Sequence, residues 1–195
     1  MPTSNLYNYR KRNESLKVAF APDDNCIHYA LVAMVSILEN TKRNVDIIIL
    51  YSNLSDKSIE YLNTLKVYKN CNLILKKIDE SCFDGFKMSS WTTIQTWFRV
   101  LIPDLFPEFD KVIYLDCDTM TRSDISQLYD INLSSYLAGA VKDLYYSDVL
   151  CQRLQLKTKT YFNAGVLLIN CKKWREVGLF KKIEDCAKHN ELIKY

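Results

Sequence analysis

Residues 112–118 read Val112-Ile113-Tyr114-Leu115-Asp116-Cys117-Asp118, an apolar run that ends in two aspartates at positions i and i+2. The apolar part predicts a buried parallel β-strand, and open α/β sheets bind ligands beyond the carboxyl ends of such strands. Because side chains alternate along a strand, we expect both carboxylates to leave the same side of the backbone. Paired carboxylates there could hold a divalent cation that is shared with substrate phosphates. The segment therefore indicates metal-assisted chemistry on a phosphorylated substrate.

The Asp-x-Asp pair also has an ordinary structural interpretation. Such pairs occur in loops, where the carboxylates cap helices or face solvent. The position at a predicted strand end favours a functional interpretation, and the rest of the chain has to decide between the two. Cys117, between the aspartates, is interpreted as a buried filler rather than as a ligand.

The composition is typical of a globular protein. The chain has 195 residues, of which 48% are apolar and 25% charged, enough for one domain with a substantial core. The net charge is +3 and no stretch concentrates Lys and Arg on one face, which argues against a nucleic-acid partner. Only 4 Gly and 4 Pro are present, which excludes flexible low-complexity linkers.

The cysteines and the first residues bear on the location of the protein. The seven cysteines are scattered, odd in number and without Cys-x-x-Cys spacing, which predicts a reducing compartment, with the cytoplasm as the default. The beginning of the chain lacks the apolar core of a signal peptide, and no apolar run reaches the about 18 residues that a transmembrane helix needs. We expect residues 1–15 to form a polar tail and residues 16–195 to form a single domain.

Short β-rich runs alternate with longer helical patterns. Strands are predicted at residues 16–21, 45–51, 72–78, 110–115, 137–141 and 165–170. Helices are predicted from Asp23 or Asp24 to residue 39, at residues 55–68, at 91–102 with a stop at Pro103, at 123–128 as a short turn, and at 172–189. This alternation predicts a Rossmann-like α/β domain, in which a mostly parallel central sheet carries helices on both faces. The glycine-rich turn of a dinucleotide site is missing after the first strand.

Five ordered motifs lie between about residue 16 and residue 180. They read Phe20-Ala21-Pro22-Asp23-Asp24-Asn25, Thr96-Trp97-Phe98-Arg99, residues 112–118, Gly139-Ala140-Val141-Lys142-Asp143, and Tyr161-Phe162-Asn163-Ala164-Gly165-Val166-Leu167-Leu168-Ile169-Asn170. Together they resemble bacterial glycosyltransferase family 8, the relatives of glycogenin and of the galactosyl- and glucosyltransferases that build lipopolysaccharide. The resemblance implies the GT-A type of nucleotide-diphospho-sugar transferase fold. It also implies retaining transfer of a hexose, glucose or galactose, from a UDP-sugar to a glycan or lipid-linked saccharide of the lipopolysaccharide type.

The resemblance further implies roles for residues at the predicted strand ends. Asp116 and Asp118 would bind Mn²⁺, with Mg²⁺ as a substitute, and the cation would stabilise the charge on the departing UDP. Arg99 would offer a rigid fork to the diphosphate or to sugar hydroxyls, which makes it a catalytic residue together with the two aspartates. The residues implied in nucleotide binding are Ala21, Asp23, Asp24, Asn25, Arg99, Asp116 and Cys117.

The last motifs are implied in binding the sugar and the acceptor. Asn163, Ala164 and Gly165 would line the sugar pocket, because small residues let a hexose approach the backbone and Asn can bond two hydroxyls. Asp143 would contact the sugar or the acceptor. Structural interpretations stand beside these roles: Asp23 or Asp24 as a helix N-cap, Arg99 as a surface ion pair, Asp143 as a helix cap, and residues 163–165 as a β-bulge or a turn that enters a strand.

Two elements of the family pattern would follow the point where this sequence stops. They are an acidic Asp-Gln-Asp loop and a C-terminal His that completes the metal site, and His189 lies too early, in helical sequence, to serve as that His. We therefore expect a truncated form that binds donor and turns over poorly by itself. Peripheral membrane association would come through the absent C-terminal part.

Three other functions stay open from the sequence. Asp116-Cys117-Asp118-Thr119 fits the Asp-x-Asp-x-Thr pattern of haloacid-dehalogenase-like phosphatases, with the first Asp as nucleophile, although that class places the pattern near the start of the chain. A nucleotidyltransferase would share the fold and the metal pair, but the first loop lacks a glycine-rich, basic triphosphate cradle. The third alternative is a non-catalytic fragment that only binds the donor.

Overall fold

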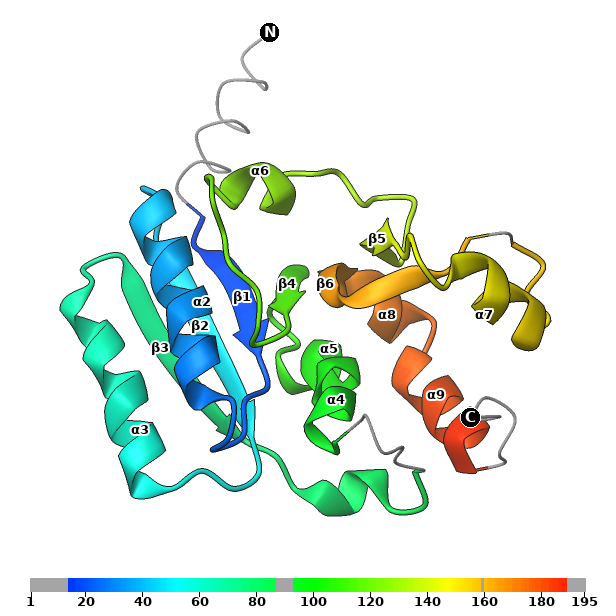
Figure 1. Cartoon of the computed structure of the whole chain (residues 1–195), viewed down its shortest axis with the longest axis horizontal. Helices are drawn as coiled ribbons and strands as arrows, with labels where there is room; N and C mark the ends of the chain where they lie inside the picture. Colours follow the sequence, from blue (N-terminus) through cyan, green and yellow to red (C-terminus); the bar gives the residue numbers. More distant parts are fainter. Residues whose placement is uncertain (1–13, 87–92, 159, 189–195) are drawn as a thin grey trace, which may run out of the picture.

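A six-stranded β-sheet forms the centre of the computed structural model, which describes residues 14–86, 93–158 and 160–188 (Figure 1). The strand order across the sheet is β3-β2-β1-β4-β6-β5. The strands are β1 (Leu16–Phe20), β2 (Val45–Tyr51), β3 (Cys71–Lys77), β4 (Lys111–Leu115), β5 (Ala138–Lys142) and β6 (Phe162–Asn170). Each of the six predicted strands is therefore confirmed, with shifts of a few residues at the ends.

Five of these strands run in one direction, and β6 runs against them. β1 pairs in parallel with both β2 and β4, and β2 pairs in parallel with β3, whereas β6 is antiparallel to β4 and to β5. The mostly parallel sheet is confirmed, but the reversal of β6 was not predicted. Antiparallel neighbours need no crossover helix, and the connection between β5 and β6 instead carries α7 (Ser147–Arg153) beyond the edge of the sheet (Figure 1).

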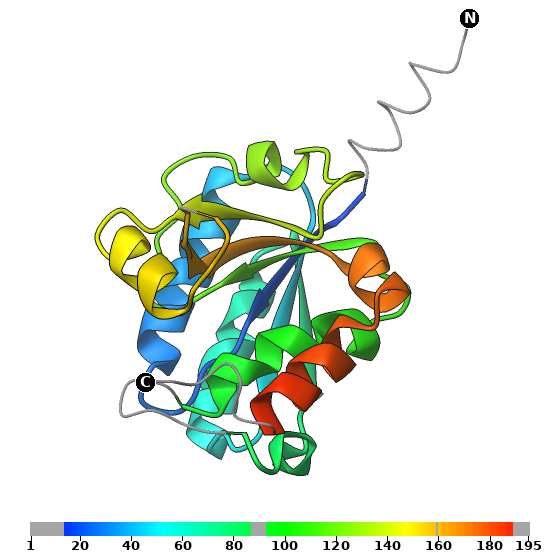
Figure 2. The same ribbon diagram turned by 90° about the vertical axis from the view of Figure 1, so that its right-hand side faces the viewer.

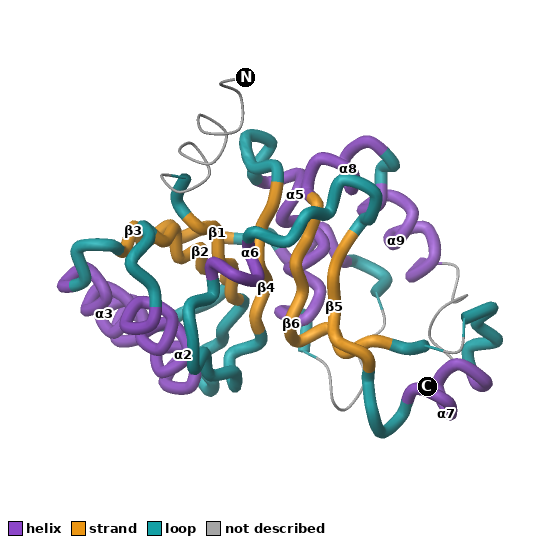
Figure 3. Tube along the Cα trace, turned by 90° about the horizontal axis from the view of Figure 1, so that it is seen from above, coloured by secondary structure: helices purple, strands orange, loops and turns teal. Residues whose placement is uncertain are grey.

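Helices cover both faces of the sheet, as the view from above shows (Figure 3). One face carries α2 (Ile27–Asn40), α3 (Asp56–Asn63) and the short α6 (Ser126–Tyr129). The other carries α4 (Gln95–Phe98), α5 (Ile102–Leu105), α8 (Cys171–Glu176) and α9 (Leu179–Lys188), and α9 runs beside α4 and α5 in Figure 2. The 3₁₀ turns are η1 (Thr64–Val67), η2 (Glu80–Phe83) and η3 (Arg99–Leu101). No helix within the described ranges has the length and apolar character needed to cross a membrane.

Each face of the sheet has its own apolar core, because the central strands are apolar on both sides. In β2, Ile47 and Ile49 belong to the core beneath α2 and α3, whereas Ile48 and Leu50 belong to the core beneath α4, α5 and α8. All four side chains are fully buried. Strand alternation thus divides one continuous apolar run between two cores, which is typical of parallel strands covered on both faces.

Three predicted helices differ from the structure. The helix predicted at residues 55–68 is α3 followed by the 3₁₀ turn η1. The helix predicted at residues 91–102 is a series of short turns, α4, η3 and α5, and Pro103 lies in the first turn of α5 instead of stopping the helix. Proline is tolerated there because first-turn N–H groups have no intrahelical partner. The final helix is divided into α8 and α9 at Gly178, whose φ of +59° is the left-handed conformation typical of helix ends. The predicted boundaries at Trp91 and His189, and residues 1–13 of the predicted tail, lie outside the described ranges.

The strand order changes direction at β1, and this places the candidate site. From β1 the chain moves outward to β2 and β3, then returns to β4 on the opposite side of β1. Ligands of such sheets bind at this switch point, in the crevice beyond the carboxyl ends of the strands. The segments that follow β1 and β4 there begin at Ala21 and Asp116. The fold therefore brings two of the five motifs to one edge.

Replacing Gly178 with alanine should lower the free energy of unfolding by about 1 kcal/mol, because a Cβ is disfavoured at its φ of +59° even though no atom lies within 4 Å of it. Urea denaturation measures this change. Gly139→Ala is the matched control, since a Cβ there would meet the Leu133 side chain at an ordinary 3.6 Å. Equal unfolding free energies for the two variants would contradict the role of Gly178.

Candidate functional site

The sheet register aligns the loop after β1 with the Asp-x-Asp segment after β4. Ala19 of β1 pairs with Tyr114 of β4. Ala21 and Asp116, each two residues further along, therefore leave the sheet at the same level. Ala21 is buried and Asp116 is half-buried, so the carboxylate remains accessible at this edge. The juxtaposition of the two predicted motifs is a property of the register.

The Asp-x-Asp segment is a turn and not the last part of a strand. β4 ends at Leu115, and the N–H of Thr119 donates to the carbonyl of Asp116 at 3.3 Å. The prediction that strand alternation sends both carboxylates to one side is therefore wrong in its premise, because the backbone leaves the extended conformation before Asp118. Asp116 is half-buried, whereas Asp118 is exposed.

Two side chains hold the carboxylate of Asp116 by the same oxygen. Arg99 Nη2 donates to Oδ1 at 2.9 Å, and the Tyr114 hydroxyl donates to it at 3.0 Å. The Arg99 guanidinium also lies over the Tyr114 ring, with Cζ 4.2 Å from the ring centroid, within range of a cation–π interaction. Burial raises the pKa of Tyr114, so its hydroxyl stays a protonated donor at neutral pH. One oxygen of Asp116 is thus fixed by the protein itself.

Arg99 is a buried cation that joins three segments. Its side chain is only 10% exposed, Nε donates to the Thr96 carbonyl at 2.8 Å, and Nη1 donates to the Ala164 carbonyl. With the bond to Asp116, three of the five guanidinium N–H groups donate to described atoms of the chain. The interpretation of Arg99 as an ion-pair residue is confirmed, but the pair lies inside the candidate site and not on a helix surface.

The beginning of β6 is irregular where it reaches the site. Ala140 of β5 pairs with Leu167, but the next residue, Val141, pairs with Asn163. Residues 164–166 are therefore passed over in the pairing with β5, so the register of the two strands shifts here. The predicted irregularity of this motif is confirmed. It coincides with the contacts that Ala164 and Gly165 make to Arg99 and Asp116.

Gly165 lies against Asp116 so closely that no side chain fits. Its carbonyl accepts the N–H of Asp116 at 2.8 Å, and its own N–H donates to Asn163 Oδ1 at 2.7 Å. A Cβ added at Gly165 would lie 2.7 Å from Asp116 Oδ2 and 3.0 Å from Asn163 Oδ1. Glycine is therefore required here by close approach of the carboxylate.

The loop after β1 is held by its two aspartates. Asp23 Oδ1 accepts the N–H groups of Asn25 and Cys26, both at 2.9 Å. Asp24 Oδ1 accepts the N–H and the hydroxyl of Ser55 and, at 2.6 Å, the hydroxyl of Ser58 at the start of α3. The N-cap of α2 is Cys26, so neither aspartate is the predicted N-cap, although Asp23 stabilises the turn before that helix.

Two thiols connect this loop to the Asp-x-Asp turn. Cys117 packs against the core beneath α2, as the filler interpretation predicted, and its thiol is hydrogen-bonded to that of Cys26. This bond lowers the pKa of Cys26 and, together with burial, raises the pKa of Cys117 far above its usual value. All seven cysteines are free thiols.

Asn163 and Asp143 lie at the same end of the β5–β6 pair. Asn163 is exposed, and because its Oδ1 accepts from Gly165, its amide NH₂ is the end that points away from the backbone contact. Asp143 follows β5, and its Oδ1 accepts the N–H groups of Tyr145 and Tyr146 at 2.9 and 2.7 Å in the turn before α7. The N-cap of α7 is Tyr146, so Asp143 is not the helix cap that was predicted, although it stabilises the turn before that helix. Its second oxygen is not part of that turn.

The donor set for a metal consists of two carboxylates. Within the described part of the chain, no group of three or more His, Cys, Asp or Glu side chains is arranged to hold a metal ion. Asp116 and Asp118 could therefore bind a cation only together with oxygens from a substrate, from water or from residues outside that part. Carboxylate and phosphate oxygens are the ligands that suit Mg²⁺ and Mn²⁺.

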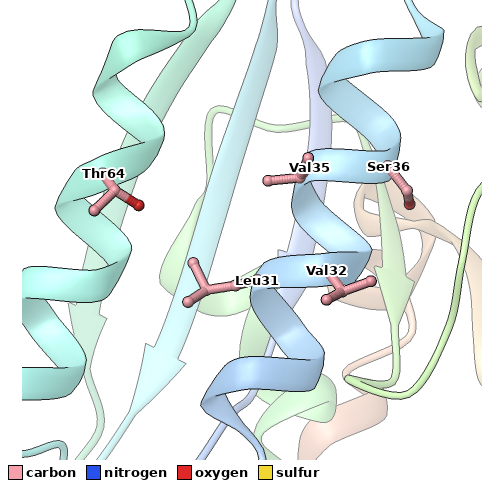
Figure 4. Close-up of a pocket in the computed structure, with 5 residues that line it drawn as sticks. All are labelled: Leu31, Val32, Val35, Ser36 and Thr64. Carbon is pink, nitrogen blue, oxygen red and sulfur yellow. The ribbon is translucent and has the colours of Figure 1, made fainter.

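An apolar groove lies along α2 where it faces the end of α3 (Figure 4). It is lined by Leu31, Val32, Val35, Ser36 and Thr64, none of which is a predicted site residue. A second hollow runs along the segment after the Asp-x-Asp turn, from Thr119 to Ile125, and reaches Val166 of β6. None of the residues that line the groove of Figure 4 is charged.

Three residues of the site were missed by the sequence predictions. Tyr114 lies two positions before Asp116 in the predicted strand, so strand alternation already placed it on the side of that aspartate, and this signal was present in the sequence. Ser55 and Ser58 start a helix far along the chain, and only the fold brings them to Asp24.

The fold is that of the α/β glycosyltransferases of the GT-A type. The structure of the galactosyltransferase LgtC in complex with donor and acceptor sugar analogues superposes with a TM-score of 0.79 at 28% identity, covering 92% of this chain and 67% of that one. The apo structure of the bifunctional glycosyltransferase WbbM shares the fold, with a TM-score of 0.76 over 89% of this chain and 34% of that one at 24% identity.

The chain belongs to glycosyltransferase family 8, whose sequence model matches residues 17–195. A putative glycosyltransferase of Haemophilus influenzae is 28% identical over 188 residues, which cover 94% of this chain and 57% of the relative. The lipopolysaccharide 1,2-glucosyltransferase of Escherichia coli K12 is 28% identical over 180 residues, which cover 87% and 52%. The chain spans about half the length of these curated relatives. The family resemblance of the five motifs is confirmed.

Asp24→Asn should destabilise the chain at neutral pH, and the loss of stability should become smaller as the pH is lowered. Hydrogen bonds from Ser58 and Ser55 lower the pKa of Asp24 below its ordinary 3.8, so folding favours the carboxylate. This contribution is fully present above pH 3.8 and is lost as the pH falls through the lowered folded-state pKa. Urea midpoints of both proteins between neutral pH and about pH 3 measure it. The control is Asp84→Asn at an exposed aspartate, and a difference that grows in acid would contradict the assignment.

Proposed function

We propose that this chain is the donor-binding part of a metal-dependent, retaining hexosyltransferase, which moves glucose or galactose from a UDP-sugar to a glycan or lipopolysaccharide-type acceptor. The proposal rests on the way in which the carboxylate of Asp116 is held at the switch point of the sheet. Arg99 and Tyr114 fix one of its oxygens, and its other oxygen lies beside Gly165 at the start of β6. A carboxylate held in this way can take a cation and a diphosphate on the side where a sugar would lie.

The relatives support the chemical class of the substrates. Two of them are named lipopolysaccharide 1,2-glucosyltransferase and lipopolysaccharide 1,3-galactosyltransferase, and the LgtC structure contains donor and acceptor sugar analogues. Membership of the same family favours a sugar donor and a saccharide acceptor for this chain. Because the chain spans about half the length of the curated relatives, their activities extend to it as a proposal.

The loop after β1 would receive the nucleotide. Asp23 uses Oδ1 for backbone N–H groups, so Oδ2 is the oxygen left to accept the imide N–H of uracil. Ala21 would let the base approach the backbone, and Asn25 is exposed at the same loop. Asp24 and Cys117 would act indirectly, by holding the loop against α3 and against the Asp-x-Asp turn.

The start of β6 would receive the sugar. The amide NH₂ of Asn163 can donate to a hydroxyl, because its oxygen already accepts from Gly165. Ala164 and Gly165 present backbone with little side chain, which lets a hexose ring approach closely. Asp143 keeps one carboxylate oxygen outside its turn and would accept from a sugar or acceptor hydroxyl.

The residues present fit a hard divalent cation such as Mn²⁺ or Mg²⁺. Asp116 would contribute Oδ2, and Asp118 would contribute an exposed carboxylate from the same turn. When bound, the cation would offset the negative charge that develops on the departing UDP. Arg99 adds a fixed positive charge beside the same carboxylate, a preorganised contribution to that stabilisation. We assign no nucleophile.

The phosphatase alternative is not favoured. Its nucleophile would be Asp116. The carboxylate of Asp116 accepts hydrogen bonds from the Arg99 guanidinium and the Tyr114 hydroxyl, and these bonds make it a weaker nucleophile but leave it suited to bind a metal ion. Membership of glycosyltransferase family 8 is also evidence against a phosphatase.

The cytoplasmic location stays a prediction, and the seven free cysteines support it.

Calorimetric titration of UDP into the chain should show binding with Mn²⁺ present and none after chelation. Without the cation, the two negatively charged carboxylates would repel the negatively charged diphosphate. Asp116→Ala and Asp118→Ala should each abolish this binding. Asp104→Ala, at an exposed aspartate of α5, should leave it unchanged. Equal UDP affinity with Mn²⁺ and with chelator would refute the metal-dependent site.

Gly165→Ala should weaken Mn²⁺-dependent UDP binding by about 10–100-fold, since the new Cβ would push Asp116 Oδ2 out of place while Oδ1 stays bonded to Arg99 and Tyr114. The same titration measures the loss. Gly139→Ala, on the neighbouring strand β5, is the matched control. If Gly165→Ala binds UDP like the unmodified chain, the closeness of Gly165 to Asp116 has no bearing on the donor.

A further inference from the structure

The hydroxyl of Tyr114 contacts the carboxylate of Asp116, which the sequence predicts to be a ligand of the cation. Tyr114 is the fourth residue of β4, its side chain is nearly fully buried at 2% exposure, and it belongs to the core beneath α4, α5 and α8. A buried phenol needs a partner for its O–H group, and here that partner is Oδ1 of Asp116 at 3.0 Å. The ring cannot move without disturbing the core, so the hydroxyl is a fixed point.

The bonds to Oδ1 determine which oxygen of Asp116 is left for a ligand. A carboxylate oxygen has two lone pairs, and Oδ1 already accepts from Tyr114 and from Arg99. Oδ2 lies on the other side, next to Gly165, and the N–H of Asp116 is bonded to the Gly165 carbonyl at 2.8 Å. Both the backbone and the side chain of Asp116 are therefore oriented before a ligand arrives.

We propose that Tyr114 is a positioning residue of the donor site, which holds Asp116 so that only Oδ2 is presented to the cation–diphosphate complex. It acts through Asp116 and does not touch the substrate. Its ring also supports the Arg99 guanidinium, 4.2 Å from its centroid, so the phenol steadies both groups of the ion pair. Hydrogen-bond partners that orient metal ligands in this way typically change metal affinity by about 10–100-fold when removed. This inference rests on the proposed function.

The test is Tyr114→Phe, which deletes the hydroxyl and keeps the ring in the core. We expect the Mn²⁺-dependent affinity for UDP to fall about 10–100-fold by calorimetry, and the affinity for Mn²⁺ alone to fall as well in a titration followed by the paramagnetic resonance of free Mn²⁺. The control is Tyr129→Phe. Tyr129 is also 2% exposed, and its hydroxyl donates to the Lys111 carbonyl at 3.2 Å on the far end of β4.

The two variants separate positioning from simple destabilisation. Both lose one buried hydroxyl, so urea denaturation should give similar free energies of unfolding, while only Tyr114→Phe should lose Mn²⁺ and UDP affinity. Unchanged affinities in Tyr114→Phe, with the unmodified chain binding normally, would overturn the inference and leave the proposed function standing. Equal losses in both variants would show a structural effect and also overturn it. A chain that binds neither Mn²⁺ nor UDP would overturn the proposed function and this inference with it.

Discussion

The guanidinium of Arg99 is the group on which the candidate site depends. A buried charge is costly unless it is paired and hydrogen-bonded, and this one is satisfied by a carbonyl of its own turn, a carbonyl of β6 and the carboxylate of Asp116. One side chain thereby fixes the relative position of three segments that are distant in the sequence. The irregular backbone at Ala164 and the turn at Asp116 each direct an oxygen atom at the guanidinium. Arg99 therefore holds these two segments of the candidate site together in the absence of any ligand.

The second constraint is that the loops at the switch point are tied together independently of Arg99. Asp24 connects the loop after β1 to the start of α3, and the thiols of Cys26 and Cys117 connect it to the turn after β4. These contacts reach both neighbours of β1. Beyond Ala21, which still belongs to the core beneath α4, α5 and α8, the loop that would receive the nucleotide is therefore held by polar side chains.

The sequence predicted the architecture well because apolar runs and strand-end motifs are local signals. All six strands, the two-sided helical cover and the meeting of the Asp23 loop with Asp116 follow from such signals and from the order of the elements. The details that failed depend on distant partners or on backbone conformation. The reversed direction of β6, the turn that contains Asp118 and the Arg99–Asp116 pair are decided by tertiary contacts. Pro103 and Gly178 show that a helix end depends on where in a turn the residue lies.

The reversed direction of β6 divides the site into two inheritable halves. The proposed nucleotide half lies where parallel strands end, whereas the proposed sugar half lies where β6 begins, after the connection that carries α7. A change of length or sequence in that connection would reach the proposed sugar half first and would leave the ends of β1 and β4 in place. If the proposed function holds, such a scaffold can vary its acceptor while it keeps one donor nucleotide.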